Sequence, residues 1–374
     1  MTGVRSPAVS VVVCTTRNPD RLRQTLDALP SGAEGVAYEL VLVLNGADRD
    51  VAAVARAEEA AGAGVVVVES GENLGFAGGT NLGVAAAHAP LLLLLHDDAV
   101  LEPGALRALV EAASRHPEAG VVGPLILGPS GLIKHAGAIM FADGVSASPH
   151  AGADPRGVTL EARTTDYCGS CCALVRAELW RACGGLDERF FPSGYIDADL
   201  AFTARRLGWT VRYEPGARAR HADGSLSHGF KEWCLLRNRE RFLAKWREDL
   251  AELEPRDGSP EALSRAVAGA ARRQPAPAGS RTPPPRPETG SSTRERELEL
   301  LRAYVAEVDR EVVARREEVV ARDELLAARG QELASLHTYV EGLARDLDSL
   351  NRAAAVDAAE ITRLHAVIAE LQGR

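Results

Sequence analysis

Two adjacent carboxylates follow the longest aliphatic run of the chain, where they could bind a cation. Leu91–Leu95 is all leucine, and His96, Asp97 and Asp98 come directly after it. If this run is a buried parallel strand, both carboxylates stand at its carboxyl end, which is where open α/β sheets bind ligands. Carboxylate oxygens suit Mg²⁺ or Mn²⁺, and these ions in turn hold phosphate oxygens. The segment therefore predicts a divalent-cation site, although acidic residues after a strand are also common without one.

A glycine-rich segment could bring the backbone close to a ligand. Residues 73–83 read Asn-Leu-Gly-Phe-Ala-Gly-Gly-Thr-Asn-Leu-Gly and follow the apolar run 65–68. Glycines at this density indicate a sharp turn or a close approach of the backbone. The end of the segment opens a helical pattern, and helix N-termini attract phosphate. An ordinary tight loop explains the composition equally well.

Three further residues could act on a substrate. Asp197 and Asp199 open an amphipathic helical pattern, and residues two apart on a helix point in different directions. One of them can therefore face a site, while the other caps the helix or is solvated. His221 follows the strand-like segment 211–214, and a histidine there is by itself more often structural than a ligand.

The segments that carry these residues predict an α/β fold. Short runs of valine and leucine indicate buried parallel strands at 9–14, 40–44, 65–68 and 91–95. Helical patterns lie between them at 20–29, 50–61 and 79–87, and this alternation predicts a doubly wound sheet. Farther along we expect strands at 121–127, 171–176 and 211–214, and helices at 176–183, 197–207 and 230–250.

The last third of the chain differs in composition and in the spacing of its apolar residues. Residues 255–293 are rich in proline and predict a linker between a domain at 1–254 and a coiled coil at 294–374. With Leu298 at heptad position a, each a position is apolar: Leu298, Val305, Val312, Val319, Leu326, Leu333, Val340, Leu347, Ala354, Ile361 and Ile368. β-branched residues at a with leucine at most d positions favour a parallel homodimer.

Three consecutive d positions weaken the coiled-coil pattern, because Arg315, Arg322 and Arg329 would face one another in a homodimer. A heteromeric partner with acidic d residues would relieve that repulsion. A single solvated helix is the remaining alternative.

Composition excludes some classes of protein. The net charge of −9 argues against a general nucleic-acid binder. No signal-peptide pattern or membrane-length apolar run is evident, so we expect a cytoplasmic protein with reduced thiols. Cys168 and Cys171 fit a buried strand better than half of a zinc site. For the basic and aromatic segment 231–247 we favour a helix packed on the domain, with contact with the inner membrane face as the alternative.

Taken in order, these motifs resemble family 2 glycosyltransferases of the rhamnosyltransferase-like branch. The resemblance covers about residues 8–247. Besides residues 11–18, 73–83 and 96–98, it rests on Gly184-Gly185-Leu186-Asp187-Glu188-Arg189-Phe190-Phe191, Asp197-Ala198-Asp199-Leu200, Gly208-Trp209, His221 and Arg237-Asn238-Arg239. It implies a GT-A fold, which is Rossmann-like with a mostly parallel mixed sheet. It also implies inverting, metal-dependent transfer from a nucleotide-diphosphate sugar to a hydroxyl of a glycan, a lipid-linked acceptor or a cell-surface polysaccharide.

The resemblance also implies roles for individual residues. Asp98 and His221 would bind the metal ion, and Asp197 would be the catalytic base. The residues expected to bind the nucleotide-sugar donor are Thr15, Arg17, Asn45, Asn73, Gly75, Gly78, Gly79, Asn81, Asp97 and Arg237.

Two departures from the family pattern leave an alternative open. Leu44 stands where the family often has an aspartate that contacts the nucleotide base, and Ile196 replaces the glutamate before the expected catalytic base. A non-catalytic scaffold with a degenerate sugar-nucleotide-binding domain would tolerate both. A nucleotidyltransferase is disfavoured, because the loop 14–18 lacks glycine.

Overall fold

The computed structural model describes residues 6–62, 64–169, 171–222, 228–273 and 293–372. Its contacts divide the chain into two compact units, residues 1–300 and residues 301–374. The first unit contains every strand of the described chain. The second unit consists of the greater part of one long helix.

The amino-terminal half of the first unit is a parallel α/β layer. Its strands are β1 (Val9–Thr15), β2 (Tyr38–Asn45), β3 (Val65–Ser70) and β4 (Leu91–His96). The helices between them are α1 (Pro19–Ala33), α2 (Arg49–Ala61) and α3 (Gly75–Val84). The strands lie in the order β3-β2-β1-β4, so the order reverses at β1 and leaves a crevice at the carboxyl ends of β1 and β4. The predicted strands and helices of this half are confirmed to within a few residues at their ends.

The second half continues the same sheet with mixed pairing. From β4 the order runs through β11 (Cys172–Arg176), β6 (Ala119–Leu127), β12 (Thr210–His221) and β10 (Arg163–Thr164). Two short strands join its side, β5 (Ala99–Leu101) on β12 and β7 (Ile133–His135) on β6. A separate pair is formed by β8 (Ile139–Met140) and β9 (Ser146–Ala147). The helices of this half are α4 (Ala105–Arg115), α5 (Ala177–Cys183), α6 (Ile196–Arg206) and α7 (His228–Ala251), with a 3₁₀ turn at Glu188–Phe190.

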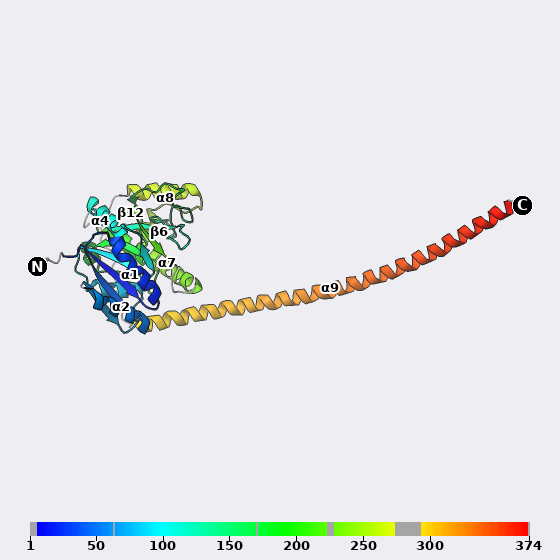
Figure 1. Ribbon diagram of the computed structural model, residues 1–374, viewed down its shortest axis with the longest axis horizontal. Coiled ribbons are helices and arrows are strands. Elements are labelled where there is room, and N and C mark those ends of the chain that lie inside the picture. The colour runs from blue at the N-terminus through cyan, green and yellow to red at the C-terminus, as the bar shows by residue number, and fades with distance from the viewer. Residues whose placement is uncertain (1–5, 63, 170, 223–227, 274–292, 373–374) are drawn as a thin grey trace. The chain divides into compact units, whose positions relative to one another are not determined.

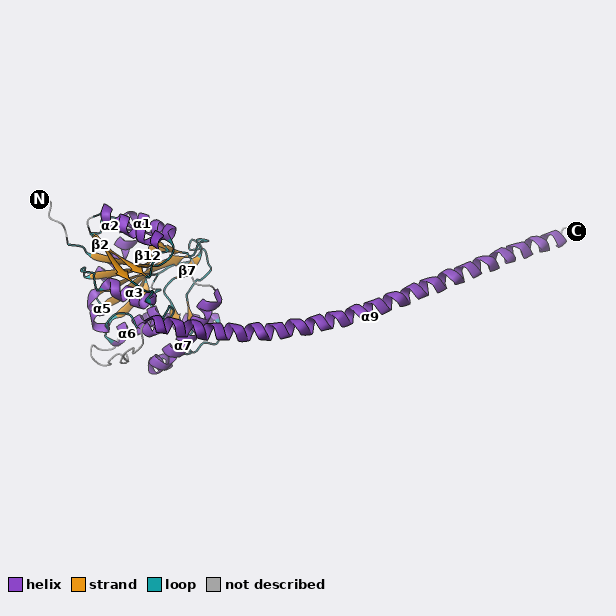
Figure 2. Cartoon of the chain, turned by 90° about the horizontal axis from the view of Figure 1, so that it is seen from below, coloured by secondary structure: helices purple, strands orange, loops and turns teal. Residues whose placement is uncertain are grey.

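Helices cover both faces of the sheet, as Figures 1 and 2 show. In Figure 2, α1 and α2 lie on one side of the strands, and α3, α5 and α6 lie on the other. Each face has its own apolar core, one centred on Leu22, Leu29 and Leu106 and the other on Phe202 and Trp246. Because successive strand residues point to opposite faces, the doubly covered strands must be apolar throughout, as their sequences are.

The predicted linker at 255–293 needs a correction. Residues 260–272 form α8 (Pro260–Arg272), which Ser259 caps by accepting a hydrogen bond from the Ala262 amide. Pro260 is at the start of the helix, where its missing amide hydrogen costs nothing. The alanines on the inner face of α8 pack against Ile139 and Phe141. Residues 274–292 of the predicted linker lie outside the described residues.

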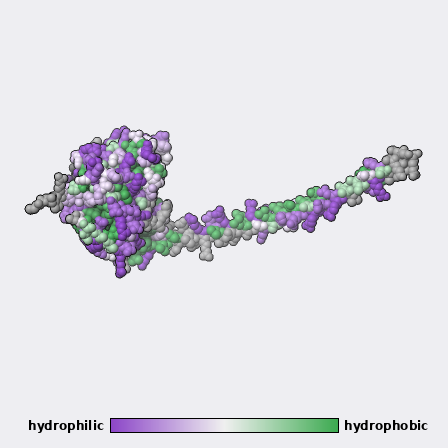
Figure 3. Space-filling model, viewed as in Figure 1, coloured by the Kyte–Doolittle hydropathy of each residue, from purple (hydrophilic) through white to green (hydrophobic). Residues whose placement is uncertain are grey.

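The carboxyl-terminal helix, α9 (Thr293–Gln372), confirms the predicted helical segment but does not test its pairing. Many of its apolar side chains are exposed, among them Leu326 and Leu350 at 68% each. Figure 3 shows apolar residues gathered along much of the visible face of this helix. Among the described helices, α9 included, none is both long enough and apolar enough to cross a membrane.

Candidate active site

The first carboxylate of the predicted cation site is fixed at the crevice between β1 and β4. The Thr15 hydroxyl at the end of β1 donates to Asp97 Oδ2 at 2.7 Å, and the Thr25 hydroxyl donates to the Asp97 carbonyl at 3.0 Å. Burial raises the pKa of Asp97, and the neighbouring charge of Asp98 raises it further. Thr15 and Asp97, both predicted to bind the donor, are therefore in direct contact with each other.

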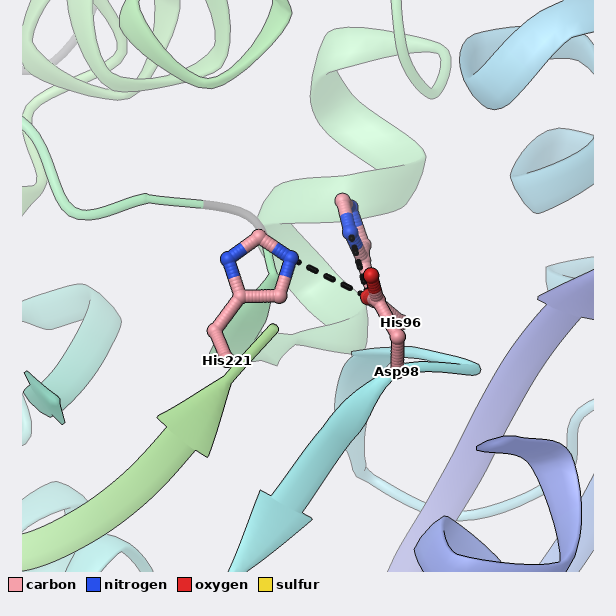
Figure 4. A group of neighbouring side chains, drawn as sticks. All are labelled: His96, Asp98 and His221. Carbon is pink, nitrogen blue, oxygen red and sulfur yellow. Dashed lines mark ion pairs between the residues drawn. The ribbon is translucent and has the colours of Figure 1, made fainter. Parts of the chain in front are cut away.

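The second carboxylate is surrounded by cationic and imidazole groups. Asp98 Oδ1 lies 3.1 Å from His221 Nε2 and 3.8 Å from His96 Nδ1, and Asp98 Oδ2 lies 3.3 Å from Arg21 Nη1. Figure 4 shows the two imidazole rings converging on this carboxylate. Burial acts to raise the pKa of Asp98, but the hydrogen bond and charge of His221 outweigh it and lower the pKa. Asp98 is thus held as an anion.

Sheet pairing explains why His221 reaches a carboxylate so far away in the sequence. The end of β12 pairs antiparallel with β5, and this register sets His221 opposite Ala99. The Ala222 amide donates to the Asp98 carbonyl at 3.2 Å and extends this pairing. On its other side, the His221 ring meets Lys134, whose Nζ lies 3.0 Å from Nδ1. The predicted metal ligands Asp98 and His221 are therefore brought together.

Sequence reasoning missed His96 and Arg21 as members of this site. One nitrogen or oxygen atom from each of His96, Asp98 and His221 lies within 4.8 Å of the others, close enough for the three side chains to hold one metal ion. Burial, followed by the charge of His221, lowers the pKa of His96 to about 4, so its ring is neutral at neutral pH. Its place in the sequence was an available signal, because His96 is the last residue of β4 and immediately precedes the two site carboxylates.

Asp197 shares a cavity with both histidines of this group. It lies in the first turn of α6 and lines a cavity of about 340 Å³ that His96 and His221 also line. The Ala198 amide donates to Asp197 Oδ1 at 3.1 Å. The predicted base and the metal-binding group therefore face one shared space.

Asp199 points away from this cavity, as its two-residue spacing from Asp197 predicted. Its carboxylate is 1% exposed. Trp246 Nε1 donates to Asp199 Oδ1 at 2.7 Å, and Lys245 Nζ lies 2.7 Å from the same oxygen. Asp199 therefore anchors α6 to α7.

The glycine-rich segment packs tightly against β1 and β2. A β-carbon at Gly79 would lie 2.4 Å from Cys14 Sγ, and one at Gly83 would lie 2.5 Å from Val43 Cγ2. Both distances are far below van der Waals contact, so close helix–sheet packing alone requires glycine at these positions. At Gly78 a β-carbon would meet Leu74 at 2.8 Å. Roles for Gly78 and Gly79 in donor binding stay predictions.

The asparagines of this segment hold the loop in place. The buried Asn45 amide donates to Asn73 Oδ1 and to the Gly75 carbonyl, and Asn45 Oδ1 accepts from the Leu74 amide. Asn81 donates to the Leu186 carbonyl and accepts from the Leu186 amide. In both Asn45 and Asn81, the amide nitrogen and the amide oxygen are therefore hydrogen-bonded within the protein.

None of the ten predicted donor-binding residues, Arg17 and Arg237 included, is among those that line the cavity. Arg17 is exposed in the loop after β1. Arg237 donates to the Phe191 carbonyl at 3.3 Å, and its guanidinium lies 5.9 Å from the centre of the Trp233 ring. Their contacts with a donor stay predictions.

Cys168 and Cys171 are buried and form no disulfide, but the prediction that they lie in a strand was wrong, because β11 begins at Cys172. Burial raises the pKa of both Cys168 and Cys171 to about 12, so neither is a thiolate at neutral pH. In the described part of the chain, the metal-binding group does not include either cysteine.

Comparison with known families now decides the classification. Residues 7–242 match the model of the family described as glycosyltransferase-like family 2. The chain belongs to this family. The match confirms the family predicted from the sequence motifs, and it spans the two site carboxylates, His221 and Asp197.

This family 2 chain is similar to proteins named for glycan synthesis. The O-antigen biosynthesis protein RfbC of Myxococcus xanthus is 30% identical over 213 residues, which are 55% of this chain and 16% of that protein. The N-acetylglucosaminyl-diphospho-decaprenol L-rhamnosyltransferase of Mycobacterium tuberculosis is 31% identical over 182 residues, which are 42% of this chain and 58% of that protein. The matched region is thus less than two thirds of the length of either relative.

A solved structure shares the fold of this family 2 chain. The crystal structure of GalNAc-T7 with UDP, GalNAc and Mn²⁺ superposes with a TM-score of 0.52 at 14% identity, covering 67% of this chain and 50% of that one. This likeness confirms the predicted GT-A fold.

Proposed function

We propose that this family 2 member is an inverting, metal-dependent glycosyltransferase that moves a sugar from a nucleotide-diphosphate donor to a hydroxyl group. One observation carries the proposal. Asp197 lines the same cavity as His96 and His221, whose rings face Asp98. A single displacement needs this arrangement, with a group that neutralises the leaving diphosphate on one side and a proton acceptor on the other.

The donor set fits a divalent cation. Asp98 offers an anionic oxygen, and His221 offers Nε2 at 3.1 Å from it. A bound cation would stabilise the negative charge that develops on the leaving nucleoside diphosphate. The GalNAc-T7 structure holds Mn²⁺ together with UDP, which is consistent with such an ion here. Asp97, fixed by Thr15, would orient the donor beside it.

Asp197 is the proposed catalytic base. As the acceptor oxygen attacks the anomeric carbon, its proton passes to the Asp197 carboxylate, while the bond to the nucleoside diphosphate breaks on the other face. One displacement inverts the anomeric centre and needs no covalent enzyme intermediate. Ile196 is 2% exposed and packs in the core beside the base, so the residue in the family's glutamate position serves the fold here.

The acceptor is proposed to be a glycan or a lipid-linked sugar. The named activity of the mycobacterial relative, transfer to a diphospho-decaprenol-linked sugar, supports this class. Lys231 and Leu235 of α7 line the cavity, and Leu236 beside them is 59% exposed. The second half of α7 packs inward through the buried Phe242 and Trp246. Contact with an anionic membrane is therefore proposed for the first half alone, at the cytoplasmic face.

Vesicle flotation tests the membrane contact. The full chain should float with vesicles that contain phosphatidylglycerol, and Leu236→Ser should reduce the floated fraction, because it removes an exposed apolar side chain. Equal flotation of the wild type and Leu236→Ser would contradict the proposed contact between α7 and the membrane.

Dimerisation through α9 is proposed as the assembly. Its exposed apolar heptad positions, Val305 and Leu326 among them, would be buried against a second copy. Two catalytic units held together would raise the local concentration of active sites at a polymeric acceptor. Light scattering should give a dimer for the full chain and a monomer for a chain that ends at residue 300. A full-length monomer would contradict the assembly.

A panel of nucleotide sugars tests the transfer itself. The full chain with Mn²⁺ should hydrolyse or transfer one of them, and NMR of the product should show an inverted anomeric configuration. A retained configuration would contradict the single displacement. Absence of turnover across the panel, with no thermal stabilisation by any donor, would favour the non-catalytic scaffold.

A further inference from the structure

We infer that the chain has a second binding site, for a small anion with an apolar body, in a cavity beside α8. This α8 cavity has a volume of about 570 Å³, which is in the range of small-molecule sites. It adjoins the cavity of Asp197 along the chain at the end of β7, where His135 lines the cavity of Asp197 and Ala136 lines the α8 cavity. None of the side chains of the cation group lines it, so the inference does not rest on the proposed function.

The lining of the α8 cavity comes from segments that are far apart in the sequence. Leu263 and Val267 belong to α8, and Pro149 and Leu160 belong to the loop before β10. Helix α8 lies beyond residues 7–242, which match the family model. The family match therefore does not account for this cavity.

Arg163 of β10 brings a positive charge to the α8 cavity. Its Nη2 donates to the Ala136 and Gly137 carbonyls at 2.8 and 3.2 Å, and it makes no ion pair in the described part of the chain. The charge of Asp166 acts on it from farther away, but Asp166 is already paired with two other arginines. Burial is the largest influence on the pKa of Arg163 and lowers it, so neighbouring anions do not offset the loss of water. The guanidinium thus lacks a counter-charge.

Tyr213 adds a second hydrogen-bond donor beside this guanidinium. It also lines the α8 cavity, and Arg163 Cζ lies 4.9 Å from the centre of its ring. The Tyr213 Oη is buried and has no hydrogen-bond partner among the described residues. Burial raises the pKa of Tyr213, so the hydroxyl keeps its proton and can donate. Two neighbouring donors without an acceptor fit the oxygens of a carboxylate or phosphate, which a guanidinium binds well.

The rest of the lining indicates what the anion carries. Leu160, Leu263 and Val267 are apolar, and an inorganic anion at Arg163 would leave them without a partner. An anion with an alkyl or aromatic body would cover them as well. Glu161 lines the same cavity at an exposed position, so its carboxylate would repel such a ligand. It is also the side chain that could compete with the ligand for Arg163.

Binding of 4-phenylbutyrate to the full chain tests the inference, because this compound joins a carboxylate to an apolar body. Saturation-transfer NMR and isothermal titration calorimetry measure the dissociation constant. A single site per chain should bind it with a constant in the millimolar range or below. The matched probes are 4-phenylbutanol, which lacks the charge, and acetate, which lacks the body. Both should bind at least about 10-fold more weakly.

Variants of the lining assign the binding to the α8 cavity. Arg163→Gln removes the charge and should weaken binding of 4-phenylbutyrate by at least about 10-fold. Tyr213→Phe removes only a hydroxyl that has no partner in the free protein, so it should weaken binding about 3- to 10-fold without lowering the melting temperature. Glu161→Gln should bind the compound more tightly. Arg156→Gln, on an exposed arginine of the same loop, is the matched control and should bind as the wild type does.

Three results would overturn the inference. They are the absence of saturable binding, equal binding of 4-phenylbutanol and 4-phenylbutyrate, and equal binding of 4-phenylbutyrate by the wild type and Tyr213→Phe. Glu161→Gln with a lower melting temperature and unchanged binding would identify Glu161 as the partner of Arg163 and would also overturn it. Circular dichroism shows whether each variant is folded, and Tyr213→Phe decides if Arg163→Gln is not. None of these measurements requires sugar transfer, so they leave the proposed function to its own test.

Discussion

The two units of the chain differ in how far their apolar side chains are buried. In the first unit, large side chains such as Trp246 and Phe202 are fully buried, and even the charged Asp199 has its partners inside the fold. In α9, many side chains at the heptad positions are more than half exposed, as at Val305 and Leu350. Long helices gain most of their stability from packing of an apolar face. The difference teaches that the first unit finds its packing partners within the chain, whereas the exposed apolar side chains of α9 are the reason for proposing that it packs against another helix.

Replacing the proposed metal-binding carboxylate, Asp98, should abolish sugar transfer and leave the oligomeric state unchanged. Asp98→Ala removes the anionic oxygen between His96 and His221, and transfer should fall by at least about 10³-fold, which corresponds to several kcal/mol of lost charge stabilisation. EDTA should do the same to the wild type. The exposed Asp20, replaced by alanine, is the control. Full activity in EDTA would contradict the mechanism, and a change in oligomeric state would contradict the independence of the units.

Asp197 and Asp199 provide a matched pair of variants within α6. Asp197→Asn keeps the shape but removes the proton acceptor, so turnover should fall by about 10²- to 10⁴-fold with donor binding and melting temperature unchanged. Asp199→Asn weakens a buried pairing with Lys245, so it should cost on the order of 3 kcal/mol of stability. Turnover and chemical denaturation of both variants check this. A loss below about threefold for Asp197→Asn would move the base to another residue.

Substitutions at Gly169, beside the proposed base Asp197, should have a smaller effect, on acceptor binding. A β-carbon there would lie 3.9 Å from both Asp197 Oδ2 and His135 Nε2, which is ordinary contact. Gly169→Ala should therefore fold normally, and the larger Gly169→Val should occupy space beside the base. We expect Gly169→Val to raise the KM for the acceptor by about 10-fold and to leave the KM for the donor unchanged. An equal rise in both constants would place the acceptor elsewhere.

The smallest effect is expected in α9. Arg322→Leu replaces a charged d position with an apolar one and should stabilise a parallel dimer by about 1–2 kcal/mol. Thermal melting of the separate segment 294–374, followed by circular dichroism, measures this. Transfer by the full-length variant should not change. A lower melting temperature would show that Arg322 has an acidic partner, and would favour a heteromeric assembly.

The parallel half of the sheet could be predicted from the sequence because strands covered on both faces are continuous apolar runs. Helix α8 could not, since the proline-rich sequence around it resembles a linker and its inner face consists of alanines such as Ala266. Of the site, Asp98, Asp197 and His221 were found through motif order. Arg21 and His96 were missed, because their roles depend on how α1 and β12 approach the end of β4.

The contact between Lys134 and His221 has a consequence for metal uptake. A histidine that gives its Nε2 lone pair to an ion carries its proton on Nδ1, and a lysine ammonium has only hydrogens to offer. The ammonium found 3.0 Å from Nδ1 therefore cannot keep that contact once the ion is bound. Loading the proposed site would be an ion exchange, in which a divalent charge displaces a monovalent one from the same imidazole. Lys134 also lines the cavity of Asp197, so binding of the proposed ion would rearrange charge beside the proposed base as well.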